Sequence, residues 1–165
     1  MKNAIEVSHL TKDYGSFRLD DISFTLPGGS ILGLIGENGA GKTTVIKCML
    51  GLTHRDSGEI RLLALEEERS VKEEIGVVLD ESSFHDALKV KDVDKILSRV
   101  YSQWDSALFR DYCRKYSLSD DKTVKAFSRG MKMKLSIAAA LSHHPKLLLL
   151  DEATGWCGTS CWMNF

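Results

Sequence analysis

A glycine-rich stretch at residues 36–44 has the residue types and spacing that suit a chain of phosphates. Gly36 to Thr43 fits the pattern G-x-x-x-x-G-K-S/T. Its glycines let successive backbone N–H groups turn inward toward phosphate oxygens, at a helix N-terminus whose dipole favours an anion. Lys42 can reach the terminal phosphates and the Thr43 hydroxyl can ligate Mg²⁺. The alternative is a chance glycine turn. The residues expected to contact the ligand here are Gly36, Glu37, Asn38, Gly39, Ala40, Gly41, Lys42, Thr43 and Thr44.

Two adjacent carboxylates, Asp151 and Glu152, follow the apolar run Leu147–Leu150. At the C-terminal end of a buried strand, Asp151 can hold a metal ion directly or through water, and Glu152 can orient or deprotonate an attacking water. Glu152 and Lys42 are therefore the expected catalytic residues. The alternative is an ordinary strand that ends in a charged turn.

Apolar runs and turn residues predict an α/β framework around these groups. Ile31–Ile35 is a nearly continuous apolar run, typical of a buried parallel strand leading into the glycine turn. A helix is predicted from Lys42 to about Leu52. Further strands are predicted near Ile5, Val7 and Leu10, at Ile22–Leu26, at Gly58–Leu62 and at Ile75–Leu79.

From Val90 onward the apolar residues follow a helical period. The helix-face residues are Val93, Ile96, Leu97, Val100 and Tyr101. A second helix is predicted to start near Asp105, a suitable N-cap, and a third to span roughly Met131–Leu141. The run Leu147–Leu150 then returns to a buried strand. This order predicts an α/β core with a helical subdomain.

Composition narrows the class of protein. The 165 residues are 43% hydrophobic and 27% charged, with 22 basic against 23 acidic side chains and a net charge of −1. This balance argues against nucleic acid as a partner. The sequence has no run long enough to span a membrane and no apolar leader, which predicts a cytoplasmic protein. The spacing of Cys157 and Cys161 argues against a zinc site. His143 and His144, before Pro145, are expected to be solvated or to face the helix dipole.

The residues between the glycine turn and the acidic pair resemble one family. Phe127-Ser128-Arg129-Gly130-Met131 resembles the L-S-G-G-Q signature of ABC ATPases, and more closely the F/Y-S-x-G-M-x-x-K-L variant of one bacterial branch. The stretch from Ala138 to Glu152 is similar to the same family, and Tyr14-Gly15 after Lys12 resembles its adenine-stacking loop. The resemblance covers residues 2 to about 155, with its motifs in the family's order.

The resemblance implies a P-loop NTPase (RecA-like) α/β core with an N-terminal antiparallel β subdomain and a helical insert subdomain at about 85–140, forming one nucleotide-binding domain over 1–155. It implies ATP and Mg²⁺ as ligands, with Tyr14 stacked on adenine. It also implies a dimer with a second copy or a paralogue, in which Ser128 and Gly130 face the γ-phosphate bound opposite. Dimer closure would drive an integral membrane permease, which predicts a location on the inner face of the cell membrane.

Two positions depart from the family pattern. Where relatives carry a glutamine that ligates the metal and links to the permease, Asp80 follows the predicted strand Ile75–Leu79. A carboxylate ligates Mg²⁺ at least as well, so Asp80 is an expected metal ligand beside Thr43 and Asp151. Arg129 replaces a signature glycine and either meets phosphate or points to solvent.

The tail at 156–165 does not match the family. Relatives carry a different sequence there, and one possible set of codons for it can be read one base later. That shifted reading gives the run Cys157 to Asn164. We therefore predict a frameshift near Gly155 and a truncated chain. The alternative is a divergent short tail. A truncated chain is expected to hydrolyse ATP far more slowly than a full-length relative, because hydrolysis needs the full set of positioned groups.

Three functions follow from these observations. The first is the ATP-hydrolysing subunit of an ABC transporter. The second is a nucleotide-binding remnant with little or no turnover, which the tail favours. The third is a soluble ABC ATPase of translation or DNA repair, although such proteins usually bring a second cassette or a long insert.

Overall fold

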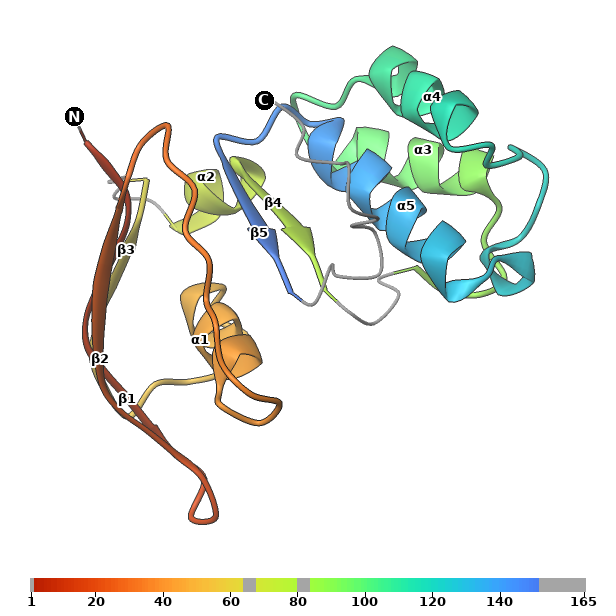
Figure 1. Cartoon of the computed structure of the whole chain (residues 1–165). Helices are drawn as coiled ribbons and strands as arrows, with labels where there is room; N and C mark the ends of the chain where they lie inside the picture. The colour runs from red at the N-terminus through yellow and green to blue at the C-terminus, as the bar shows by residue number, and fades with distance from the viewer. Residues whose placement is uncertain (1, 64–67, 80–83, 152–165) are drawn as a thin grey trace. The chain divides into compact units, whose positions relative to one another are not determined.

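The computed structural model describes residues 2–63, 68–79 and 84–151 (Figure 1). The chain divides into two compact units, Met1–Lys72 and Glu73–Phe165. Each unit has a β-sheet of its own, with strand order β2-β1-β3 in the first and β4-β5 in the second. The two sheets differ in kind, because the first is antiparallel and the second is parallel.

The first unit is built on a long antiparallel hairpin with a third strand beside it. The strands are β1 (Asn3–Asp13), β2 (Arg18–Pro27) and β3 (Ser57–Leu62). They confirm the strands predicted in these regions. Ile5, Val7 and Leu10 of β1 are buried, in keeping with the alternation of a strand that has one face on a core. The step from Val7 to Leu10 breaks this alternation at a register shift, where His9 has a φ of 54°.

Helix α1 (Lys42–Met49) contributes four residues to the core of the first unit: Val45, Ile46, Cys48 and Met49. It ends earlier than the sequence predicted. The N–H of Gly51 donates to the carbonyl of Cys48 at 3.1 Å, and the N–H of Leu52 donates to that of Lys47 at 2.9 Å. Gly51 has a φ of 68°, so a glycine in the left-handed conformation ends the helix. The short helix α2 (Glu68–Glu73) follows β3.

The predicted strand at 31–35 is wrong for this structure. Residues 30–37 form no strand and run as an irregular segment between β2 and α1 (Figure 1). Ile31 and Ile35 are 85% and 99% exposed. A strand persists only where a neighbour accepts and donates its ladder hydrogen bonds. Among the described residues no strand pairs with this segment, so its apolar run is not enough to make it a strand.

The second unit contains the parallel pair β4 (Ile75–Val78) and β5 (Leu147–Leu150), as predicted. The two strands run in register, with Ile75 opposite Leu147 and Val78 opposite Leu150. Gly76 allows the close approach of the last turn of helix α5 (Arg129–Leu141), because a Cβ there would lie 2.8 Å from the carbonyl oxygen of Ala140.

Three helices of the second unit confirm the predicted helical region. They are α3 (Val90–Val100), α4 (Ser106–Lys115) and α5 (Arg129–Leu141). Asp105 caps α4 as expected, accepting from the N–H groups of Ala107 at 2.9 Å and Leu108 at 2.8 Å. These bonds, chiefly that from Leu108, hold the pKa of Asp105 below its ordinary value. The buried core residues around the helices are Val90, Val93, Phe109, Cys113, Leu118, Val124, Phe127, Leu135, Ala138 and Ala139.

His143 was expected to be solvated or to face the helix dipole. The first alternative is wrong, because this residue is only 2% exposed. Its ring stacks on Tyr101, with centroids 4.1 Å apart and an interplanar angle of 12°. Its two ring nitrogens lie 3.4 Å from the carbonyl oxygen of Ala139 and 3.3 Å from that of Ile75. Burial lowers the pKa of His143, so the ring is held neutral. His144 is exposed, as expected.

Candidate nucleotide-binding site

The glycine-rich loop at 36–41 has a turned backbone that only glycine adopts without strain at two positions. Gly39 and Gly41 have φ values of 87° and 91°. Between them, the N–H of Ala40 donates to the carbonyl oxygen of Glu37 at 3.1 Å and closes a tight turn. Gly41 is the N-cap of α1. The sequence pattern therefore corresponds to a loop that turns directly into a helix, as predicted.

The first turn of α1 offers free hydrogen-bond donors. In the part of the chain that the structure describes, the N–H groups of Lys42 and Thr43 contact no acceptor. They lie at the positive end of the helix dipole, beside exposed loop residues. Oriented N–H groups of this kind form a concavity that binds anions. The local backbone thus fits a phosphate group.

Lys42 folds back across the mouth of this loop. Its Nζ atom donates to the carbonyl oxygens of Gly36 at 2.7 Å and Glu37 at 2.8 Å. No carboxylate among the described residues pairs with this ammonium. A bound phosphate would therefore replace two neutral carbonyl acceptors with an anionic acceptor, which binds an ammonium more strongly. This contact was not predicted from the sequence, although the role of Lys42 in phosphate binding was.

The start of β2 packs against the loop. A Cβ added to Gly41 would lie 2.5 Å from Cδ2 of Leu19 and 2.7 Å from Cζ of Phe17. A glycine is therefore required at position 41 both for its backbone conformation and for the space that these side chains fill. The sequence pattern identified Gly41 but gave no indication of Phe17 or Leu19, which contact it from 22–24 positions upstream in the chain.

Tyr14 lies in the hairpin turn between β1 and β2 and is 51% exposed. Its N–H donates to the carbonyl oxygen of Phe17 at 2.9 Å, and the N–H of Gly15 donates to Asp13 Oδ1 at 2.6 Å. Phe17 thus contacts both the turn that carries Tyr14 and the glycine loop. One rigid hairpin links the expected base-binding ring to the expected phosphate-binding loop.

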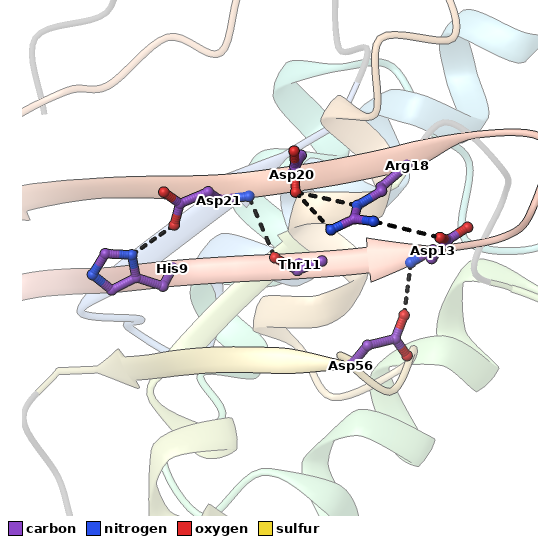
Figure 2. A network of polar contacts seen from close by, with 7 residues as sticks. All are labelled: His9, Thr11, Asp13, Arg18, Asp20, Asp21 and Asp56. Atoms are coloured by element: carbon purple, nitrogen blue, oxygen red, sulfur yellow. Dashed lines mark hydrogen bonds and ion pairs between the residues drawn. The ribbon is translucent and has the colours of Figure 1, made fainter.

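A polar network surrounds this turn (Figure 2). Asp56, directly before β3, accepts the N–H of Asp13 at 2.7 Å. Arg18 lies between two carboxylates, 2.9 Å from Asp20 and 4.0 Å from Asp13. Farther along the hairpin, His9 Nδ1 is 2.6 Å from Asp21 Oδ1. The network fixes the end of the hairpin where Tyr14 is located.

The expected signature residues lie in the second unit, at the start of α5. Ser128 is the N-cap of this helix, and its Oγ accepts the N–H of Met131 at 3.3 Å. Ser128, Arg129 and Gly130 are all exposed, while Phe127 is buried and anchors the segment to the core. Lys132 adds an ion pair with Asp86 at 2.6 Å. The N-terminus of α5 is thus exposed, while Phe127 and the Lys132–Asp86 ion pair hold the segment in place. Such a helix N-terminus is suited to an anion from another molecule.

Asp151 is an expected metal ligand that lies among the described residues of the second unit. It follows β5 and is 5% exposed, and its N–H donates to the carbonyl oxygen of Val78 at 2.8 Å. Asp80 and Glu152 lie outside the described residues. Thr43 belongs to the first unit. Over residues 2–63, 68–79 and 84–151, no three His, Cys, Asp or Glu side chains are grouped as a metal site.

Comparisons with known proteins point to one family. Residues 19–155 match the family described as ABC transporter. Lantibiotic transport ATP-binding protein SrtF of Streptococcus pyogenes is 35% identical over 153 residues, covering 91% of this chain and 66% of that protein. Bacitracin transport ATP-binding protein BcrA of Bacillus licheniformis is 33% identical over 160 residues, covering 93% of this chain and 52% of that protein. The chain thus spans about two thirds of the first relative and about half of the second.

Solved structures agree on the fold. One, described as the ATP binding subunit of an ABC transporter, matches with a TM-score of 0.80 at 25% sequence identity. The match covers 91% of this chain and 66% of the chain in that structure. Another, cbiO1 from Clostridium perfringens, has a TM-score of 0.70 at 22% identity, covering 92% of this chain and 66% of its own, and supports the fold alone. In the described ranges, no helix has the length and apolarity needed to cross a bilayer.

Proposed function

Because the chain belongs to the ABC transporter family of ATP-binding proteins, with the P-loop α/β fold and antiparallel β subdomain of that family, we propose that it is an ATP-binding and ATP-hydrolysing subunit of a transporter. The observation that carries the proposal is the loop at 36–44. There, left-handed glycines, unbonded N–H groups and the Lys42 ammonium meet at one exposed helix N-terminus.

Each residue of the site has a proposed role. The nucleotide phosphates bind the N–H groups of residues 36–44, Lys42 leaves the carbonyls of Gly36 and Glu37 for a phosphate oxygen, and Tyr14 stacks on the base. Thr43, Asp151 and Asp80 are the proposed Mg²⁺ ligands, and bound Mg²⁺ neutralises charge on the phosphates. Glu152 orients the attacking water and takes its proton.

The proposed partners follow from the two helix N-termini, those of α1 and α5, that are suited to an anion. A second copy or a paralogue would place the α5 N-terminus, with Ser128 and Gly130, on the phosphate bound in the first unit of the opposite chain. Residues 1–155 would act together as one nucleotide-binding domain, with the helices at about 85–140 as its helical subdomain. An integral membrane permease would hold the dimer at the inner face of the cell membrane.

A second candidate, a chain that binds nucleotide with little turnover, is favoured by one observation. The segment Ile31–Ile35 leads directly into the glycine loop but pairs with no described strand. Phosphate binding needs mainly the loop and α1, whereas hydrolysis needs several catalytic groups held in place around the reacting phosphate. A loop that β2 supports at Gly41, but that no strand supports through Ile31–Ile35, would therefore retain binding and hydrolyse ATP slowly.

One pair of measurements separates the two candidates. Mg-ATP is titrated into the full chain by calorimetry, and phosphate release is followed at saturating Mg-ATP. Binding with steady turnover supports the ATPase subunit, and binding with no turnover above a buffer blank supports the second candidate. Absence of binding at millimolar Mg-ATP would contradict both.

A further inference from the structure

We propose that Lys12 and Asp56 position Tyr14 for a purine base, by covering one face of its ring and leaving the other face open. The inference rests on the proposed function, since it concerns how the same site recognises the base of its nucleotide. It adds two positioning residues, neither of which belongs to the glycine loop.

Lys12 covers one side of the Tyr14 ring. Its Nζ atom lies 5.3 Å from the ring centroid, within the range of a cation–π contact. The Lys12 side chain is only 15% exposed, so the ammonium is held against the ring rather than extended into water. Tyr14 nevertheless remains 51% exposed. The ring therefore has one occupied side and one side available to a ligand.

Asp56 holds Lys12 in this place. The Lys12 Nζ atom donates to Asp56 Oδ1 at 2.8 Å, across 44 positions of sequence, and Asp56 Oδ2 accepts the N–H of Asp13 at 2.7 Å. Both oxygens of one carboxylate thus bond to the last two residues of β1, directly before the turn that carries Tyr14. The hydrogen bond with Asp56 raises the pKa of Lys12, and the same bond lowers the pKa of Asp56. Both groups are charged at neutral pH.

The backbone beneath the ring is fixed as well. Asp13 Oδ1 accepts the N–H of Gly15 at 2.6 Å, and the N–H of Tyr14 donates to the carbonyl oxygen of Phe17 at 2.9 Å. The contact between Asp56 and Asp13, and the Arg18 side chain beside Asp13, are drawn in Figure 2. The Tyr14 ring is held in place before a ligand arrives, which reduces the ordering cost of binding.

The chemistry of the open face favours a purine. Stacked π systems repel through their negative faces, and a cation under one ring draws π density away from the opposite face. An electron-rich aromatic base therefore stacks more favourably on this ring than on a tyrosine without a cation. The Lys12 ammonium is already engaged with Asp56, so it is not available as a phosphate ligand.

The test compares Mg-ATP with Mg-tripolyphosphate, which carries the phosphates but no base. Both are titrated into the full chain as wild type, Lys12→Met, Asp56→Asn and Lys12→Arg. We expect the Met and Asn variants to lose about threefold to tenfold in affinity for Mg-ATP and to keep their affinity for Mg-tripolyphosphate. Lys12→Arg should restore most of the Mg-ATP affinity, because a guanidinium also lies well over a tyrosine ring.

A matched control is Lys91→Met, which removes a similar Lys–Asp pair, that of Lys91 with Asp121 at 2.7 Å, without touching Tyr14. It should change neither affinity. A double-mutant cycle with Tyr14→Ala should show no further loss of Mg-ATP affinity on adding Lys12→Met. Equal weakening of both ligands by Lys12→Met, or no weakening of Mg-ATP, would overturn the inference. A wild-type chain that binds neither ligand would instead refute the proposed function.

Discussion

The backbone of Gly41 lies against the side chain of Leu19, so that a Cβ at position 41 would lie 2.5 Å from Leu19 Cδ2. A distance this short requires the Leu19 side chain, the strand or the loop to move. The contact joins the hairpin that carries Tyr14 to the helix that begins at Lys42. The geometry of the glycine-rich loop at 36–41 therefore depends on the antiparallel sheet as well as on its own glycines.

Gly41→Ala should destabilise the chain and weaken Mg-ATP binding together. The left-handed backbone and the clash with Leu19 should lower the free energy of unfolding by roughly 2 kcal/mol or more. Gly29→Ala is the control, because Gly29 also has a positive φ, 75°, but a Cβ there would meet nothing within 4 Å. Urea unfolding and nucleotide titration of both variants check this. Equal stability and affinity for the two would show that the Leu19 contact is unimportant.

Lys42→Ala should weaken Mg-ATP binding by at least about tenfold, because it removes a charge-assisted hydrogen bond to phosphate. The measurement is a calorimetric titration of the full chain. Lys47→Ala serves as the control, since Lys47 is an exposed residue in the last turn of the same helix. It should leave the affinity unchanged. An unchanged affinity of Lys42→Ala would refute the assignment of this loop as the site.

Ser128→Asp should separate the role of this residue as a helix cap from its proposed role in dimer formation, where it faces the phosphate bound by a second chain. Aspartate caps a helix about as well as serine, so the free energy of unfolding should change by less than about 0.5 kcal/mol. The added negative charge should repel a phosphate presented by a second chain and abolish ATP-dependent dimers in analytical ultracentrifugation. Ser128→Thr, which keeps a neutral hydroxyl cap, should retain them. ATP-dependent dimers that persist in the Asp variant would contradict the proposal that Ser128 faces the phosphate bound by the opposite chain.

His143 should make the chain less stable in mild acid. Burial lowers the pKa of the folded ring, so the unfolded chain takes up a proton first as pH falls below about 6.5. Stability is fully present above that pH and decreases below it, by at most about 1.4 kcal/mol per pH unit for one proton. The neighbouring titratable groups that act on the ring are His144 and Glu74.

Urea unfolding at pH 7.5 and pH 5.5 tests this dependence. His143→Gln should have a smaller loss of stability between the two pH values than wild type, because glutamine does not titrate. His144→Gln should retain the wild-type loss, because His144 is exposed. The same loss in both variants would show that another group causes it.

Ile35→Lys should reduce self-association with little effect on folding. Ile35 is 99% exposed in an apolar segment without a pairing strand among the described residues, and such segments associate between molecules. Light scattering should fall, while the free energy of unfolding changes by about 0.5 kcal/mol or less. The contrasting variant is Ile5→Lys, which buries a charge at a position 3% exposed and should unfold the chain. A large loss of stability in Ile35→Lys would show that the segment is buried in solution.

Features that depend on neighbouring residues could be predicted from the amino-acid sequence. The glycines of the loop predicted the turn before α1, and Asp105 predicted the start of α4. Each of these follows from backbone dihedral preferences or from hydrogen bonds to N–H groups two or three residues away. The strands β4 and β5 were also identified, because parallel strands have nearly continuous apolar runs.

Contacts between residues far apart in the chain became apparent only from the fold. The apolar run Ile31–Ile35 needs a partner strand, and no local pattern states whether one is present. His143 is buried because Tyr101 covers it, and Lys12 meets Asp56 from 44 positions away. Such contacts depend on how strands and helices pack, and the spacing of residues along the chain does not encode them. For that reason the glycine turn before α1 could be predicted from its own residues, whereas the contacts that support Tyr14 and Gly41 became visible only in the folded chain.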